Sequence, residues 1–175
     1  MTQGVELTAE QLAGVLERAE CLHDAAAIET ALDHLGERIS ADLADARPLV
    51  LGVMTGAIVP MGRLLNRLDF PLEIDYIHAT RYNKTTTGRE LVWLARRQTP
   101  LRDRHVLLVD DILDEGHTFR GLIDECREHG AASVHTAVLA DKPNAARVPG
   151  LAADYVGLTV PERYVFGSGM DYKGY

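Results

Sequence analysis

The residues best suited to chemistry lie in one short stretch, Val106–Thr118, which reads VLLVDDILDEGHT. Four apolar residues precede two adjacent aspartates, Asp110 and Asp111, and two further carboxylates follow at Asp114 and Glu115. Carboxylates can bind sugar hydroxyls, ligate a hard cation or act as a general base. The glycine-containing turn that comes next opens a helical pattern, and a turn of this kind into a helix N-terminus can hold a phosphate.

A sugar phosphate is the ligand that fits this combination. Two carboxylates would repel a phosphate unless they bind hydroxyls and a cation neutralises part of their charge. We therefore expect ribose hydroxyls on Asp110 and Asp111. The alternative is that the acidic residues only cap a helix, which explains one or two of them but not four in six positions after a buried strand. The 5-phosphate is expected in the following turn, on Glu115, Gly116, His117 and Thr118.

Two amphipathic helices are predicted within residues 1–47. Thr8 and Gln11 have the spacing of a capping box, Asp24 can cap the second helix, and Arg47-Pro48 ends it. Apolar residues follow helical spacing in both. These are Leu12, Val15, Leu16, Ala19 and Leu22 in the first helix, and Ile28, Leu32, Leu35, Ile39 and Leu43 in the second.

After residue 48 the pattern changes to short apolar runs separated by helical stretches. Helices are predicted around Ile58–Leu68 and Phe119–Cys126. Val- and Leu-rich strands joined by helical crossovers indicate an α/β fold, with a mainly parallel sheet flanked by helices on both faces. Residues 81–90 are too polar for a core and too long for a tight turn, so we expect a mobile loop. The strand candidates are Leu49–Met54, Leu72–Thr80, His105–Ile112, Ser133–Ala140 and Asp154–Val160.

Composition limits the class of protein. A chain of 175 residues and 19.2 kDa, 46% hydrophobic and 25% charged, is expected to form one soluble domain. A net charge of −8 disfavours a nucleic-acid partner. No apolar run reaches the roughly 18 residues that cross a membrane, and the first residues do not resemble a signal peptide. Two cysteines, Cys21 and Cys126, suit a reducing compartment, so we expect a cytoplasmic protein.

Val106–Thr118 resembles the phosphoribosyl-pyrophosphate-binding motif of type I phosphoribosyltransferases. The motif consists of four hydrophobic residues, two acidic, two hydrophobic, one acidic, any residue, Gly, any residue and Thr, and the match is complete. From about Leu49 to the end the resemblance narrows to the hypoxanthine-guanine branch. It implies the type I fold with a small hood, as one domain over residues 1–175: N-terminal helices at 1–47, a core at 49–141 and a purine-binding hood at 142–175.

The resemblance also implies a catalytic apparatus. Asp114 matches the general base beside purine N7, and Tyr82 belongs to the mobile loop that closes over the site. Thr55 and Gly56 match a loop that binds diphosphate through backbone amides, often with a non-proline cis peptide. Arg81 is a further diphosphate residue. Thr55 stands where some relatives have lysine, and Gly56 could alternatively be only a strand-to-helix turn glycine.

The purine end resembles the family as well. Lys142 matches a lysine that donates to the 6-oxo group, Tyr164 an aromatic that stacks on the base, and Val165 a residue whose backbone meets the purine edge. Asp171 matches a position near a second Mg²⁺, the first being expected at Asp110 and Asp111. In isolation, Lys142 would be interpreted as a solvated loop lysine and Tyr164 as a core aromatic.

The implied reaction transfers ribose 5-phosphate from phosphoribosyl pyrophosphate to hypoxanthine or guanine with Mg²⁺ as cofactor, in a homodimer or homotetramer. Relatives usually continue to an arginine that contacts diphosphate, whereas this sequence stops at Tyr175, so we expect that a tail is missing from it. Three alternatives stay open: an enzyme that prefers xanthine or a pyrimidine, an RNA-binding regulator with this fold, and a sugar-phosphate-binding module without turnover.

Overall fold

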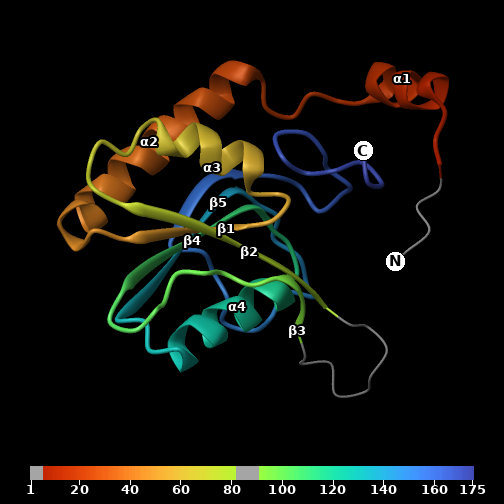
Figure 1. The fold of residues 1–175 in the computed structure, drawn as a ribbon. Helices are drawn as coiled ribbons and strands as arrows, with labels where there is room; N and C mark the ends of the chain where they lie inside the picture. The colour runs from red at the N-terminus through yellow and green to blue at the C-terminus, as the bar shows by residue number, and fades with distance from the viewer. Residues whose placement is uncertain (1–5, 82–90) are drawn as a thin grey trace.

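A computed structural model describes residues 6–81 and 91–175, which form a six-stranded sheet in the order β3-β2-β1-β4-β5-β6 (Figure 1). All neighbouring strands are parallel except β2 and β3. This arrangement confirms the predicted α/β fold with a mainly parallel sheet. The strands are β1 (Leu49–Val53), β2 (Glu73–Arg81), β3 (Leu91–Ala95), β4 (His105–Leu113), β5 (Ser133–Asp141) and β6 (Tyr155–Thr159).

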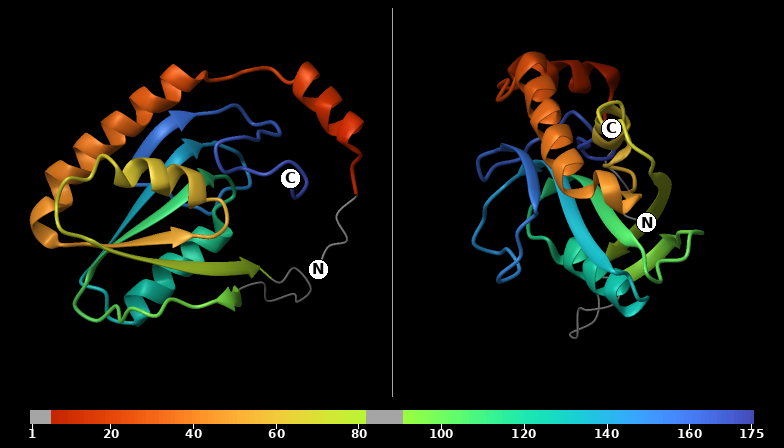
Figure 2. Two further views of the ribbon diagram at one scale, coloured as in Figure 1. Left: turned by 45° about the horizontal axis from the view of Figure 1, so that its top comes forward. Right: turned by 90° about the vertical axis from the view of Figure 1, so that its left-hand side faces the viewer.

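Helices cover both faces of this sheet. Helices α2 and α3 lie on one face and α4 lies on the other (Figures 1 and 2). Asp24 caps α2 through a bond from the Ala27 amide, as predicted, and a single 3-10 turn leads from α2 to Pro48. The helices are α1 (Ala9–Arg18), α2 (Ala25–Leu43), η1 (Ala44–Ala46), α3 (Ile58–Leu65) and α4 (His117–Glu128).

The central strands are buried on both sides, which explains their continuous apolar sequences. In β4, Val106 and Leu108 pack in the core beneath α4, whereas Leu107 and Val109 pack in the core beneath α2 and α3. All four are at most 2% exposed. Because parallel strands end at the same edge, the carboxyl ends of β1, β4 and β5 together form the rim on which the acidic residues lie.

Strand β3 is the element that the apolar pattern misses. It pairs antiparallel with β2 at the edge of the sheet, and Val92 and Leu94 are 38% and 60% exposed. The residues of β3, Leu91–Ala95, are all apolar, but a run of this length does not by itself distinguish a strand from a helical segment. Strand β2 extends through Arg81, so this residue ends a strand rather than opening a loop. The remainder of the predicted mobile loop, residues 82–90, lies outside the described residues.

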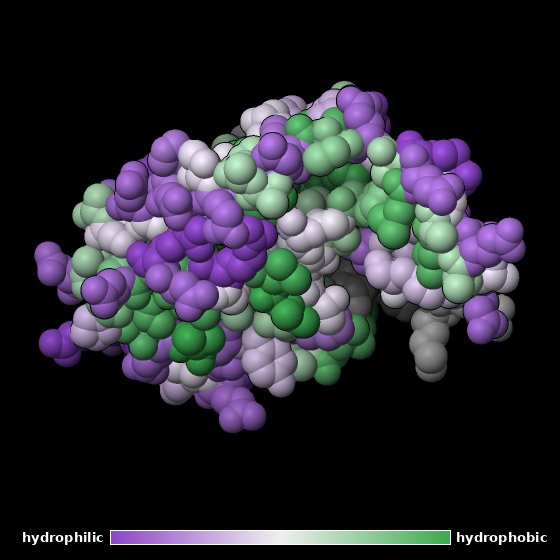
Figure 3. Space-filling view, turned by 90° about the horizontal axis from the view of Figure 1, so that it is seen from above, coloured by the Kyte–Doolittle hydropathy of each residue, from purple (hydrophilic) through white to green (hydrophobic). Residues whose placement is uncertain are grey.

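The first helix is shorter than predicted. The capping box of Thr8 and Gln11 is present, but α1 ends at Arg18 because Ala19 is already extended. None of its residues is buried, and Leu16 is 68% exposed. The chain then crosses to the C-terminal segment, where Glu20 pairs with Arg163 at 2.8 Å. Figure 3 views this side of the molecule, where hydrophobic patches interrupt a hydrophilic surface. Among the described residues, no helix is long and apolar enough to span a membrane.

Candidate active site

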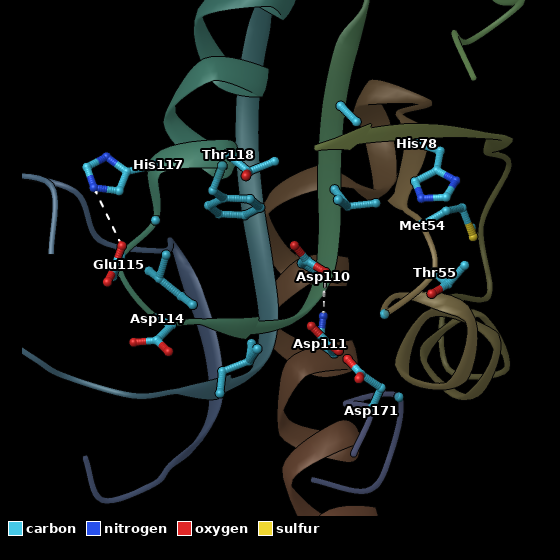
Figure 4. A pocket seen from close by; sticks show the side chains of 18 residues that line it. Met54, Thr55, His78, Asp110, Asp111, Asp114, Glu115, His117, Thr118 and Asp171 are labelled. Carbon is cyan, nitrogen blue, oxygen red and sulfur yellow. Dashed lines mark hydrogen bonds and ion pairs between the residues drawn. The ribbon is translucent and has the colours of Figure 1, made fainter. Parts of the chain in front are cut away.

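The acidic residues at the end of β4 open into a cavity of about 620 Å³ (Figure 4). Four segments form its walls: the end of β1 with the following turn, the end of β2, the β4–α4 turn and the C-terminal segment. The structure therefore brings together most of the predicted sugar-phosphate, diphosphate and metal residues. Those that line the cavity are Thr55, Gly56, Asp110, Asp111, Asp114, Glu115, Gly116, His117, Thr118 and Asp171.

Asp110 and Asp111 form a closely coupled acidic pair. Oδ1 of Asp110 accepts a bond of 2.9 Å from the Asp111 amide. Burial raises the pKa of Asp110 well above its usual value, and the neighbouring Asp111 charge adds to the effect. Burial also raises the pKa of Asp111, with a contribution from Asp171. Negative charge is therefore unfavourable here until a cation or hydroxyl donors compensate it.

The turn after β1 packs directly on Asp111. A Cβ atom at Gly56 would lie 2.5 Å from Cγ of the Asp111 carboxylate, so only glycine allows this approach. A Cβ atom at Gly169 of the C-terminal segment would likewise clash with the Gly56 carbonyl oxygen. The Met54–Thr55 peptide is cis, as the resemblance suggested for this loop.

The turn from β4 into α4 has the geometry of an anion site. Gly116 is the N-cap residue, with φ of 78°, and no side chain caps the helix. The first amides of α4 therefore have neither an intrahelical acceptor nor a side-chain cap, and they carry the positive end of the helix dipole. Nε2 of His117 lies 3.7 Å from a Glu115 carboxylate oxygen. This end of the cavity suits a phosphate.

Asp114, the candidate general base, contacts two side chains from beyond β5. The Lys142 ammonium forms an ion pair with its Oδ2 atom, and the Asn144 amide donates to its Oδ1 atom. The Lys142 side chain is 15% exposed, so it is not a solvated loop lysine. Lys142 thus lies beside Asp114, where one ligand can reach both groups.

Tyr164 and Val165 line a neighbouring cavity of about 580 Å³, between residues 16–28 and the C-terminal segment. Tyr164 is 61% exposed, and its hydroxyl donates to the Asp171 carbonyl at 3.2 Å. Its ring meets the Tyr172 ring edge-on, with centroids 5.5 Å apart. An exposed ring held in this way is available to stack on a planar ligand, whereas a core aromatic is not.

Some site residues fall outside these contacts. Tyr82 lies outside the described residues, and only the backbone of Arg81 is described, at the end of β2. Conversely, His78 lines the cavity beside the β1 turn, and sequence reasoning missed it (Figure 4). The Met54 amide donates to the Ile77 carbonyl at 2.7 Å, which keeps this part of β2 next to the turn. The position of His78 near the end of the strand that precedes the polar stretch could have indicated that it lies at the site.

The acidic pair fits the Mg²⁺ that the resemblance implies. Among residues 6–81 and 91–175, no three His, Cys, Asp or Glu side chains are grouped to hold a metal alone. Mg²⁺ commonly binds one or two carboxylates together with substrate phosphates and waters. Asp110 and Asp111 supply two such carboxylates with uncompensated charge, and Asp171 lies close enough to Asp111 to raise its pKa.

Comparisons with known proteins agree with this geometry. A family model described as phosphoribosyl transferase domain matches residues 19–173. The hypoxanthine-guanine phosphoribosyltransferase of Streptococcus pneumoniae is 36% identical over 147 residues, which cover 83% of this chain and 81% of that protein. The Bacillus subtilis enzyme of the same name is 33% identical over 146 residues, covering 83% and 81%.

Solved structures give the same result. A hypoxanthine phosphoribosyltransferase from Staphylococcus aureus superposes with a TM-score of 0.81 and 29% identity, covering 88% of this chain and 84% of that one. The Trypanosoma cruzi enzyme, as a mutant complexed with its product IMP, gives a TM-score of 0.75 and 28% identity, covering 83% and 79%. By its sequence, fold and site, this chain belongs to the hypoxanthine-guanine phosphoribosyltransferase family.

Proposed function

We propose that this protein transfers ribose 5-phosphate from phosphoribosyl pyrophosphate to N9 of hypoxanthine or guanine, which yields inosine or guanosine monophosphate and diphosphate. Such a reaction salvages purine bases. The observation that carries this conclusion is the β4–α4 segment, where paired carboxylates, Asp114 and an uncapped helix N-terminus line one cavity, with Lys142 paired to Asp114 beside it.

The sugar phosphate occupies the β4 side of the cavity in this proposal. The amides of Gly116, His117 and Thr118 bind the 5-phosphate, together with Glu115, and the ribose hydroxyls bind Asp110 and Asp111. Ribose carbon C1 then faces the turn at Thr55 and Gly56, to which the diphosphate leaves, with Arg81 and Tyr82 completing that side. The places of Asp110, Asp111 and residues 115–118 along the cavity support their roles, and the roles of Arg81 and Tyr82 rest on the family resemblance alone.

The chemistry requires one bond to break and one to form. The bond from C1 to the diphosphate oxygen breaks with oxocarbenium-like charge on the ribose, and N9 of the base forms the new bond to C1. Asp114 accepts the proton that the purine loses at N7. Lys142 donates to the 6-oxo group, Tyr164 stacks on the base, and the Val165 backbone meets the purine edge.

Mg²⁺ is the proposed cofactor. When bound, it offsets the charge of the diphosphate and polarises its bond to the sugar. Asp110 and Asp111 would hold it on the ribose side, and Asp171 would hold a second ion near the diphosphate. Support comes from the raised pKa values of Asp110 and Asp111, which burial and neighbouring carboxylates cause.

The decisive experiment is an absorbance assay with phosphoribosyl pyrophosphate, Mg²⁺ and each of hypoxanthine, guanine, xanthine, adenine and uracil. We expect efficient turnover with hypoxanthine and guanine, turnover of adenine that is slower by about 10⁴-fold, and none with any base in excess chelator. Turnover with xanthine or uracil alone would assign another base. Binding of phosphoribosyl pyrophosphate without turnover of any base would contradict the enzymatic proposal.

We further propose a cytoplasmic homodimer or homotetramer. A study of a Trypanosoma cruzi relative links its C-terminal region to its oligomeric state and enzymatic activity. In this chain, exposed apolar side chains on α3 and on the β2–β3 edge offer a surface for self-association. They are Ile58, Val59, Ile74, Tyr76, Val92 and Leu94. Analytical ultracentrifugation tests this, and a monomer at micromolar concentration would refute it.

A further inference from the structure

Arg147 lies in the connection between β5 and β6. It contacts the ends of β4 and β5, which carry the proposed purine-recognition residues Asp114 and Lys142. Its Nε donates to the Asp114 carbonyl at 3.0 Å, and its Nη2 donates to the carbonyls of Leu113 and Lys142 at 2.7 and 2.8 Å. The same Nη2 lies 2.7 Å from Oδ1 of Asp141. The side chain is only 16% exposed, so these contacts are protected from water.

The contacts link two separate parts of the site. Asp114 follows β4 and Lys142 follows β5. These two strands pair as far as Leu113 and Asp141, and the Lys142 amide donates to the Leu113 carbonyl at 2.9 Å. A planar guanidinium can bind several carbonyls in a fixed arrangement, which a lysine ammonium on a flexible stem cannot reproduce. Arg147 therefore adds a side-chain link between the residues that follow the two paired strands, where the ladder itself has ended.

The rest of this connection supports the same two groups. The Asn144 amide donates to the Asp114 carboxylate, and the Asn144 Oδ1 atom accepts from the Ala146 amide at 2.9 Å. The Val148 amide donates to the Glu115 carbonyl at 2.9 Å. Residues 144–148 therefore form a brace behind the β4–α4 turn, with Arg147 at its centre.

We propose that Arg147 is a positioning residue for base selection, which holds Asp114 and Lys142 in register for the neighbouring N7 and 6-oxo positions of one purine. This inference rests on the proposed function. The hydrogen bonds of Arg147 reach the Leu113, Asp114 and Lys142 carbonyls but none of the amides of residues 116–118, so its loss should affect the purine more than phosphoribosyl pyrophosphate. Loosening either group by about 1 Å would lower the rate on the correct base and weaken the rejection of adenine.

The test compares Arg147→Met and Arg147→Lys with the wild type and with Arg104→Met as a matched control. Arg104 is also a partly buried arginine, paired with Glu73 at 3.0 Å, but it precedes β4 at the opposite end of the sheet. For each variant, kcat and both KM values are measured with hypoxanthine and adenine, and thermal unfolding is recorded.

Arg147→Met should lower kcat/KM for hypoxanthine by about 10–100-fold, the range found for residues that orient active groups. The KM for phosphoribosyl pyrophosphate should change less than about twofold, and the preference for hypoxanthine over adenine should fall. Arg147→Lys restores charge beside Asp141 but not the three carbonyl bonds, so its base preference should stay lowered. Arg104→Met should behave as the wild type.

An unchanged hypoxanthine-to-adenine ratio in Arg147→Lys would overturn the proposal, even if Arg147→Met does not fold. An equal decrease in kcat/KM for hypoxanthine and adenine in Arg147→Met would also overturn the proposal, because a purely structural role would affect both bases alike. Failure of the proposed function is a separate result, because it would be seen as no turnover of hypoxanthine or guanine by the wild-type protein.

Discussion

Gly56→Ala tests whether the β1 turn and the acidic pair form one rigid unit. A Cβ atom at Gly56 would lie 2.7 Å from Oδ1 and 2.5 Å from Cγ of Asp111, whereas ordinary contacts begin at 3.4 Å. The carboxylate must therefore move by about 1 Å, and a displacement of that size in a reacting group costs about 10²-fold in rate. We expect kcat/KM to fall by about this factor, with a higher Mg²⁺ requirement.

The chain supplies a matched control. Gly62 lies exposed on α3, and a Cβ atom there meets nothing within 4 Å. Gly62→Ala should leave activity unchanged and stabilise the protein by about 0.5–1 kcal/mol, because alanine favours helix. Steady-state assays and thermal unfolding of both variants provide the measurement. Activity of Gly56→Ala within about threefold of wild type would show that this contact does not position Asp111.

Four further predictions concern single side chains. Asp114→Asn should lower kcat by about 10²–10⁴-fold with little change in sugar-phosphate binding. If kcat decreases by less than about threefold, Asp114 is not the base. Lys142→Met should narrow the preference for hypoxanthine over adenine, and an unchanged margin would place discrimination elsewhere. Burial raises the pKa of Asp110, so its contribution to stability is present at low pH and lost as pH rises through the raised pKa. Asp110→Asn should therefore abolish activity yet raise Tm at neutral pH by roughly 2–4 °C, and a lowered Tm would contradict this. Burial raises the pKa of the Cys126 thiol to about 11, so iodoacetamide should modify only the exposed Cys21 in the native protein, with a second thiol appearing after denaturation.

The parts of the fold that follow from local pattern were predictable. Strand β4 is apolar because both of its faces are buried, and its acidic end must lie at the rim where parallel strands terminate. Asp24 and the Thr8–Gln11 capping box lie at the starts of their helices. Both caps were predictable because capping depends only on residues a few positions apart. The mainly parallel α/β sheet and the clustering of Asp110 with Thr118 follow from these local features, whereas the type I assignment comes from the resemblance of Val106–Thr118.

What could not be predicted depends on contacts between distant segments. The five residues of β3 are all apolar, but so short a run fits a helix or a strand equally well, and the pairing with the edge of β2 decides between them. Leu16 continues the helical stripe of α1, but the described part of the chain leaves it without a core to pack against. Arg147 bonds to carbonyls 33 and 34 residues away, and no spacing rule relates a side chain to distant backbone groups.

In the function proposed above, the ion pair between Lys142 and Asp114 serves both specificity and catalysis. A 6-oxopurine presents an acceptor at its 6-position beside a proton at N7, which is the complement of an ammonium beside a carboxylate. When the base enters, the ion pair can be replaced by two hydrogen bonds, from Lys142 to the 6-oxo group and from N7 to Asp114. Neither charged side chain then lacks a partner. Adenine presents a 6-amino donor to the ammonium, so breaking the pair would leave the Lys142 charge facing a donor with no acceptor to replace Asp114, which disfavours adenine. Rejection of adenine then follows from the charge of the pair and does not require a difference in pocket shape.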